Sequence, residues 1–233
     1  MIPKVIHKVI ICDDGKVPTF PDGLKKALES FYRLNPGYTV KMYSGDTCIE
    51  YIKTHFDPEV LEAYRALKPY SYKCDLMRQL ILYTEGGWYS DIRQVCLEPL
   101  DALDALGREY VTSLDAPPNQ MCMYTAFIGS VPKHPISKKM IDLILWNVQH
   151  RHYGLDCLYP TGPGAYMHAA IDYVRAHPEK CLVGQHTSDR HVMFGTARVI
   201  TCKYNNAKGA DNTDLPGTND YGAMWRARDV YQD

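Results

Sequence analysis

Two carboxylates and an arginine lie close together in one short stretch of the chain, SYKCDLMRQLILYTEGGWYSDIRQVCLEPL, residues 71–100. Asp75 and Arg78 are three positions apart, so on a helix they share a face and their charged groups can converge on one ligand. Asp91 follows a glycine pair, which can end the helix and start an antiparallel return. The spacing therefore predicts that Asp91 comes back beside Arg78.

The same residues also have a purely structural interpretation. A surface Asp–Arg pair at this spacing stabilises a helix by only about 0.2–0.5 kcal/mol, and an aspartate after a strand can simply cap a turn. Arg93, two positions beyond Asp91, can point away and bond only to the protein. The surrounding elements and motifs must decide between the two interpretations.

Helices and strands alternate through most of the sequence. Apolar residues at helical spacing predict the helices, and Asp22, Asp57 and the glycines at 86 and 87 supply start and stop signals. The expected helices cover residues 24–34, 46–55, 58–67, 74–83, 136–148 and 165–175. Short apolar runs predict strands within residues 1–14 and over 38–43, 88–90, 110–114, 126–129 and 199–201.

This alternation indicates an α/β fold of the Rossmann-like class, with a mostly parallel central sheet and helices on both faces. Such sheets bind ligands at the carboxyl ends of their strands. A length of 233 residues is that of one domain, residues 1–233. The segment 203–233, rich in Asn, Asp, Gly and Tyr, is expected to be a loop that packs over another part of the molecule.

The composition narrows the range of partners. A formal net charge of −1 argues against a polyanion binder, and the sequence has no nucleic-acid-binding motif. The eight cysteines are spread singly, which predicts buried thiols rather than a zinc site. The apolar start is too short to span a membrane and is interrupted by Lys4, His7 and Lys8. We expect a cytoplasmic protein, bound at most peripherally to the inner face of a membrane, and leave its oligomeric state open.

Five motifs, in order along the chain, resemble those of one enzyme family. Residues 75–91, D-L-M-R-x-L-I-L-Y-x-x-G-G-W-Y-S-D, resemble the signature of the glycosyltransferases with a DXD sugar-binding region. That family includes fungal α-1,6-mannosyltransferases and the glucosylating domains of clostridial toxins. The other four motifs are IPKVIH (2–7), NPGYTVKMYS (35–44), AFIGSVPKHP (126–135) and TGPGA (161–165), with a weaker similarity at Trp225. The resemblance implies a GT-A fold in which the loop 203–233 closes over a nucleotide-sugar donor.

The resemblance also implies a role for each matching residue. Asp75 and Arg78 resemble the pair that holds the hydroxyls and the phosphate of the donor sugar, and Asp91 resembles the first Asp of the DXD motif. The same resemblance places further residues around the donor: Ile6, His7, Ile10, Tyr89, Thr161, Gly162, Pro163 and Trp225. Ile10 stands where the toxins have a Trp against the nucleotide base, so base stacking is weaker here or comes from another residue.

The second Asp of the motif falls at position 93, where this sequence has an arginine. In the family that Asp binds Mn²⁺ or Mg²⁺, which bridges the two phosphates of the leaving group. Three alternatives stay open: Arg93 replaces the charge of the metal, a metal binds Asp91 together with Asp220, or the enzyme is inactive. Asp220 is a candidate because it lies five residues before Trp225, a spacing similar to that of the toxins.

The resemblance implies a glycosyltransferase that moves a hexose from a UDP- or GDP-sugar to an acceptor hydroxyl on a glycan, glycolipid or protein, with retention of configuration. Positioning and charge stabilisation would supply the catalysis. The alternative is a non-catalytic nucleotide-sugar-binding or scaffold protein. A sugar nucleotidyltransferase is disfavoured, because CDDGKVPTF, residues 12–20, offers one glycine and one lysine for a phosphate-binding loop.

Overall fold

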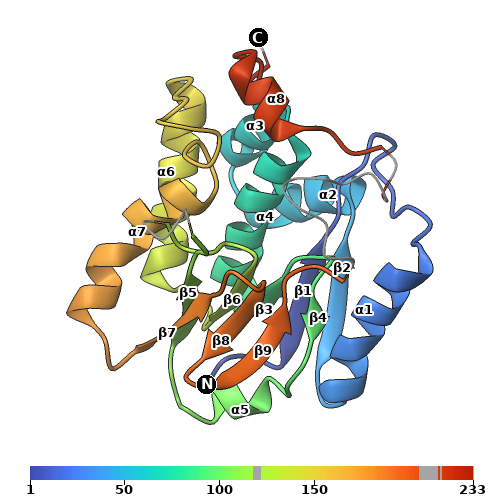
Figure 1. The fold of residues 1–233 in the computed structure, drawn as a ribbon. Helices are drawn as coiled ribbons and strands as arrows, with labels where there is room; N and C mark the ends of the chain where they lie inside the picture. Colours follow the sequence, from blue (N-terminus) through green and yellow to red (C-terminus); the bar gives the residue numbers. More distant parts are fainter. Residues whose placement is uncertain (118–121, 205–214, 216, 233) are drawn as a thin grey trace.

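A mixed nine-stranded sheet runs through the centre of the molecule (Figure 1). The computed structural model describes residues 1–117, 122–204, 215 and 217–232. The strand order is β2-β1-β3-β6-β5-β7-β8-β9-β4. The strands are β1 (Val5–Val9), β2 (Thr39–Tyr43), β3 (Gly87–Ser90), β4 (Val95–Cys96), β5 (Tyr110–Leu114), β6 (Phe127–Ser130), β7 (Cys181–His186), β8 (His191–Phe194) and β9 (Ala197–Thr201).

Strand direction brings chemically useful residues to one edge of the sheet. β1 pairs in parallel with β2 and with β3, and β5 pairs in parallel with β7. β6 runs antiparallel to both β3 and β5, so β2, β1, β3, β5 and β7 all point the same way. The centre of the sheet therefore agrees with the expected, mostly parallel arrangement, while β8, β9 and β4 form an antiparallel extension.

Helices cover both faces of the sheet, as the α/β prediction requires. They are α1 (Asp22–Leu34), α2 (Gly45–His55), α3 (Pro58–Ala66), α4 (Tyr70–Glu85), α5 (Asp101–Asp104), α6 (Pro135–Gln149), α7 (Pro163–Ala176) and α8 (Tyr221–Arg226). One hydrophobic core lies between the sheet and α4, α6 and α7, and includes Leu76, Leu80, Ile128, Ile141 and Ala169. A second core lies on the opposite face, under α1 and α5, and includes Phe31, Trp88, Leu103, Phe127 and Val199.

The connection from α4 to β3 is made by two glycines in the left-handed region of backbone space. Gly86 has φ 67° and Gly87 has φ 95°, values that side-chain-bearing residues rarely adopt. A Cβ at Gly87 would also lie 2.5 Å from Cγ1 of Val5, so only glycine fits against β1. This tight turn confirms the predicted stop of the helix and lets β3 return along α4.

Some expected details differ in the structure. Asp22 was expected to cap α1, but Pro21 occupies the cap position and Asp22 is the first helical residue, 3.0 Å from Nζ of Lys25. Asp57 is the N-cap of α3 but makes no side-chain capping bond. The sequence did not predict β4, β7, β8, α5 or α8, because each is short or lacks a clear apolar period.

The C-terminal segment and the cysteines were also the subject of predictions. Of the expected loop 203–233, residues 205–214, 216 and 233 lie outside the described residues, and the rest contains α8. All eight cysteines are free thiols, and six of them are buried, in agreement with the predicted buried thiols. Within the described part of the chain, no helix is both long enough and apolar enough to cross a membrane.

Candidate functional site

A cleft of about 500 Å³ opens where β1, β3, β5 and β7 end. The first half of α4 and residues from the C-terminal segment, including Thr218, Asn219 and Tyr221, complete its walls. The cleft brings together eight of the residues predicted for the site: Ile10, Asp75, Arg78, Tyr89, Asp91, Arg93, Gly162 and Pro163. This is the edge at which the strand pattern predicted a ligand site.

The centre of the cleft wall is the buried guanidinium of Arg78. Its Nη2 lies 3.1 Å from Oδ1 of Asp75 and 3.5 Å from Oδ1 of Asp91. Its Nη1 donates to the carbonyl oxygen of Thr125 at 2.7 Å, and the group stacks on the ring of Tyr89, 4.6 Å from the centroid. The predicted convergence of Asp75, Arg78 and Asp91 is therefore present, and it has the fixed geometry of a buried network.

Asp75 is the more deeply buried of the two carboxyl groups. Burial raises the pKa of Asp75 to about 6, although Arg78 and a hydrogen bond from Thr161 both act to lower it. The Thr161 hydroxyl donates to Oδ2 of Asp75 at 2.8 Å. A carboxyl group whose pKa is shifted by burial beside a specific cation in a cleft is typical of functional sites.

Asp91 faces the cleft from the end of β3. Its side chain is 42% exposed, and its Oδ1 accepts a hydrogen bond from the Tyr89 hydroxyl at 2.8 Å. The backbone nitrogen of Asp91 donates to the carbonyl oxygen of Ala126 at 2.9 Å. Asp91 is thus held by its backbone while its carboxylate stays available to a ligand.

Lys8 holds the turn at Asp91 through hydrogen bonds, although it was not among the residues predicted for the site. Its ammonium group is fully buried, lies 3.5 Å from the centroid of the Phe31 ring, and donates to Oγ of Ser90 at 2.9 Å. It also donates to the carbonyl oxygens of Ser90 and Asp91 at 3.3 and 3.2 Å. Burial lowers the pKa of Lys8 to about 7. A lysine in the middle of an apolar strand was the available signal in the sequence.

Four of the residues placed around the donor by resemblance do not line the cleft. Ile6 is buried in the core under α1. The imidazole of His7 lies between the carbonyl oxygen of Gly86, 2.9 Å from Nε2, and the Tyr43 hydroxyl, 3.3 Å from Nδ1. Burial lowers the pKa of His7 to about 4, so this ring is neutral and supports the glycine turn.

The other two residues of this group lie behind or beside the cleft. Thr161 is buried behind Asp75, to which it donates its hydroxyl. Trp225 is half-buried, and its indole nitrogen donates to the carbonyl oxygen of Tyr153 at 2.8 Å. In this arrangement Trp225 anchors α8 to the loop that follows α6.

The two carboxylates predicted to hold a metal both make contacts within the protein. Across residues 1–117, 122–204, 215 and 217–232, no three His, Cys, Asp or Glu side chains are grouped to hold an ion. Asp220 caps α8, with Oδ1 accepting from the backbone nitrogen of Ala223, and Asp91 already interacts with Tyr89 and Arg78. Arg93, at the position of the second Asp, is buried and lines the cleft.

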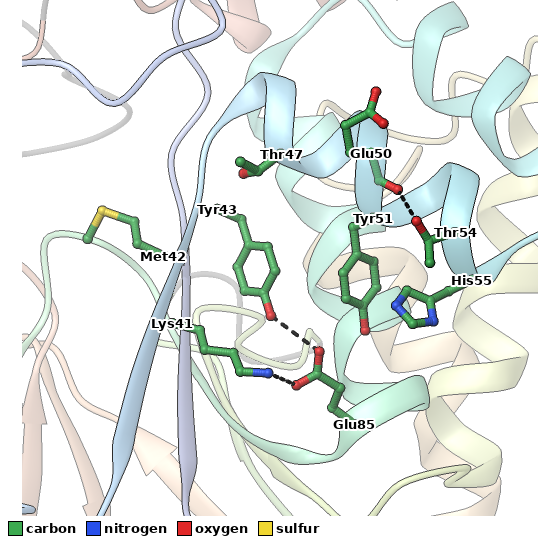
Figure 2. Close-up of a pocket in the computed structure, with 9 residues that line it drawn as sticks. All are labelled: Lys41, Met42, Tyr43, Thr47, Glu50, Tyr51, Thr54, His55 and Glu85. Atoms are coloured by element: carbon green, nitrogen blue, oxygen red, sulfur yellow. Dashed lines mark hydrogen bonds and ion pairs between the residues drawn. The ribbon is translucent and has the colours of Figure 1, made fainter.

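A second hollow of about 530 Å³ lies at the other end of α4, between β2 and α2. Figure 2 shows Glu85 between Lys41 and Tyr43, with His55 beside the ring of Tyr51. Nζ of Lys41 lies 2.6 Å from the Glu85 carboxylate, which also accepts from the Tyr43 hydroxyl at 3.4 Å. None of the residues that lined the predicted site belongs to this hollow.

The family comparison agrees with the geometry of the cleft. A family model described as a glycosyltransferase sugar-binding region containing a DXD motif matches residues 21–112. Over this range the chain is therefore similar to the DXD-type sugar-binding region of glycosyltransferases. The matched range includes the whole of α4, β3 and the Asp91 turn.

Relatives with assigned names point to the same family. An uncharacterized glycosyltransferase of Acanthamoeba polyphaga mimivirus is 29% identical over 180 residues, which are 76% of this chain and 68% of the relative. The initiation-specific α-1,6-mannosyltransferase of Candida albicans is 27% identical, over 67% of this chain and 49% of the relative. A mannosyl phosphorylinositol ceramide synthase of Saccharomyces cerevisiae is 29% identical, over 70% and 41%. The chain thus spans half or less of these fungal relatives.

A solved structure supports the fold. The PaToxG glycosyltransferase superposes with a TM-score of 0.53 at 18% identity, covering 75% of this chain and 70% of that chain. At this identity the likeness concerns the fold, and it confirms the predicted glycosyltransferase α/β architecture.

Proposed function

We propose that this chain is a glycosyltransferase that moves a hexose from a nucleotide-diphosphate sugar to an acceptor hydroxyl, with retention of configuration. The observation that carries the proposal is the cluster of Asp75, Arg78 and Asp91, in which one buried guanidinium and two carboxylates meet at the cleft. The cluster lies within the matched sugar-binding region, residues 21–112. The names of the fungal relatives support mannose as the hexose and GDP-mannose as the first donor to test.

Each group of the cluster has a task that suits its chemistry. Arg78 stays protonated, because the charges of Asp75 and Asp91 raise its pKa despite burial, and it binds a donor phosphate. Asp75 and Asp91 accept hydrogen bonds from donor hydroxyls. Transfer breaks the bond from the anomeric carbon to the phosphate oxygen and forms a bond to the acceptor oxygen, and the departing phosphate takes the hydroxyl proton. Catalysis is then positioning and charge stabilisation.

The remaining predicted residues shape the donor site in this proposal. Residues 1–233 form one domain, and the segment 203–233 with Trp225 closes over the bound donor. This is supported by Thr218, Asn219 and Tyr221, which already line the cleft. The walls are formed by Ile10, Tyr89, Gly162 and Pro163, and three residues support them from behind: Ile6, His7 and Thr161.

We propose further that guanidinium groups carry the charge that a metal carries elsewhere in the family. Arg93 lines the cleft near Asp91, and an arginine pairs with phosphate oxygens without any cation. The competing version keeps Mn²⁺ or Mg²⁺ on Asp91 and Asp220. It is the weaker one, because the Asp220 carboxylate is already used to cap α8.

Isothermal titration calorimetry tests both points. The purified protein is titrated with GDP-mannose and with UDP-glucose, each in Mn²⁺ and in EDTA, and transfer to methyl α-mannoside is then followed. We expect GDP-mannose to bind in EDTA. The Arg93→Asp variant, which restores the DXD pattern, should lose this binding in EDTA and regain it with Mn²⁺. Binding of the wild type that requires Mn²⁺ would favour the metal version.

A non-catalytic nucleotide-sugar binder is the second candidate, favoured by the arginine at position 93. It predicts donor binding with neither hydrolysis nor transfer. Transfer to methyl α-mannoside, or slow release of free mannose, would exclude it. Absence of binding to every member of a panel of UDP- and GDP-sugars would remove both candidates.

A further inference from the structure

The far end of the cleft holds a histidine–aspartate pair that no sequence motif marks. β5 and β7 are parallel neighbours, with Leu114 opposite Gln185, so the next residues, Asp115 and His186, lie side by side at their carboxyl ends. Nδ1 of His186 lies 2.9 Å from Oδ1 of Asp115. Both side chains line the cleft, and both are nearly buried, with 11% exposure for Asp115 and 13% for His186.

The hydrogen bond between His186 and Asp115 determines whether Nε2, the other ring nitrogen of His186, donates or accepts. An ionised carboxylate can only accept, so Nδ1 of His186 donates to Asp115 and a neutral ring keeps its lone pair on Nε2. That Nε2 is buried and has no hydrogen-bond partner among the residues that the structure describes. A buried acceptor without a partner is costly, which points to a hydroxyl or a water bound there when the site works.

A ring contact and two hydrogen bonds connect the pair to the proposed donor end of the cleft. The ring of His186 packs on Tyr124, with centroids 4.4 Å apart at 43°. The Tyr124 hydroxyl accepts from Nε2 of Gln94 at 3.0 Å, and Gln94 accepts from Ser90, next to Asp91. The pair therefore occupies the same cleft as Asp91, at the ends of the second and third strands beyond β3 in the sheet order.

We propose that Asp115 and His186 form the acceptor end of the cleft, where Nε2 of His186 binds a non-reacting hydroxyl of a polyol or pyranoside acceptor. The inference rests on the proposed glycosyl transfer, which fills the α4 and β3 end of the cleft with the donor. It assigns His186 to acceptor recognition, and it assigns Asp115 to holding the tautomer that keeps the lone pair on Nε2.

A second histidine provides a matched control. His55, in the second hollow, packs on Tyr51 with the same geometry, centroids 4.4 Å apart at 43° (Figure 2). The test compares wild type with His186→Phe, His186→Gln and His55→Phe, using GDP-mannose as donor and methyl α-mannoside and myo-inositol as acceptors. Phe keeps the ring and removes the nitrogen, whereas the Gln amide oxygen can accept near the position of Nε2.

We expect His186→Phe to raise the acceptor KM about tenfold, the size of one lost hydrogen bond. Donor Kd and donor hydrolysis without acceptor should stay unchanged. His186→Gln should recover much of the acceptor affinity, and His55→Phe should match the wild type. In ¹⁵N spectra of the imidazole rings, acceptor addition should shift Nε2 of His186 and leave His55 unmoved, which tests the site even if the Phe variant folds poorly.

The opposing outcomes separate this inference from the function on which it rests. Wild-type transfer with an unchanged acceptor KM in His186→Phe, or an unshifted Nε2 resonance, overturns the acceptor site alone. An equal loss of donor affinity in His186→Phe would assign the pair to the donor instead. A wild type that neither hydrolyses the donor nor transfers to either acceptor, or that binds no donor, removes the proposed function and the acceptor site with it.

Discussion

The two hollows at the ends of α4 are similar in volume, about 500 and 530 Å³, yet they differ in how they hold charge. In the cleft, the side chains of Arg78 and Asp75 are 5% and 10% exposed. In the hollow of Figure 2, Lys41 and Glu85 are 45% and 24% exposed, and Glu85 also accepts from the Tyr43 hydroxyl. Size therefore does not distinguish the two places, whereas buried charge does.

A buried charge needs counter-charges and hydrogen bonds around it, and the Arg78 network of the cleft provides them. Taking an ion out of water costs several kcal/mol unless hydrogen bonds and counter-charges offset the loss. Around Arg78 that support comes from Thr125 and from two carboxylates, of which Asp75 is itself held by Thr161. The exposed Lys41–Glu85 pair needs no such framework, because water already stabilises its charges. Four predictions test this difference, from the largest expected effect to the smallest.

Replacing Asp91 should have the largest effect on activity. Asp91→Ala removes a carboxylate that is 42% exposed to the cleft, so transfer should fall at least about a hundredfold while the fold persists. The matched control is Glu85→Gln in the second hollow, for which we expect wild-type rates. Thermal melts accompany the transfer assay. An early melt of Asp91→Ala would make the residue structural, and wild-type transfer would refute its place in the site.

Replacing Asp75 should separate activity from stability. The pKa of Asp75 is about 6 in the folded protein, above its ordinary value near 3.9, so the folded state binds more protons between these pH values. The stabilisation from this group is present below about pH 4 and is lost as pH rises through 6. Asp75→Asn should lose transfer, yet its stability relative to wild type should rise from pH 4 to pH 7, by roughly 3 kcal/mol at most.

Urea denaturation of wild type and Asp75→Asn at pH 4, 5, 6 and 7 measures this difference directly. A variant that becomes relatively less stable over that range would show that the carboxylate stabilises the fold. In that case the ion pair with Arg78 stabilises the fold by more than the burial of Asp75 destabilises it. Buried charge would then no longer distinguish the cleft from the second hollow.

Lys8 should change stability with pH in the opposite sense. Its pKa is about 7 in the folded state and near 10.4 when unfolded, so the unfolded chain binds more protons between these values. Wild-type stability should therefore rise from pH 7 to pH 10 relative to Lys8→Met, by a few kcal/mol at most. Denaturation at pH 7, 8, 9 and 10 tests this, with the exposed Lys41→Met as control. A flat difference for Lys8 would mean that its charge is not buried.

Local patterns explain why one wall of the cleft could be predicted from the sequence. Helical spacing placed Asp75 beside Arg78, and two glycines returned Asp91 to them, all within residues 75–91. The α/β class followed equally from the alternation of strands and helices. These features depend on neighbours in sequence, which patterns of apolar residues and glycines record well.

The other wall depends on contacts between distant residues. Asp115 and His186 meet only because β5 pairs with β7, and β7 was not predicted. Lys8 reaches Ser90 because β1 pairs with β3, a register that spacing within either strand cannot give. In the sequence Lys8 merely interrupted an apolar run. Strand pairing between remote segments is therefore the physical information that was missing.

The smallest expected effect concerns the pair in the second hollow. A double-mutant cycle with Lys41→Met and Glu85→Gln should give a coupling energy below about 1 kcal/mol that weakens with added salt, because both groups are partly exposed. Chemical denaturation at low and high ionic strength measures it. A coupling above about 2 kcal/mol, independent of salt, would mean that this hollow also holds buried charge. The difference in exposure would then no longer distinguish the cleft at Arg78 from the second hollow.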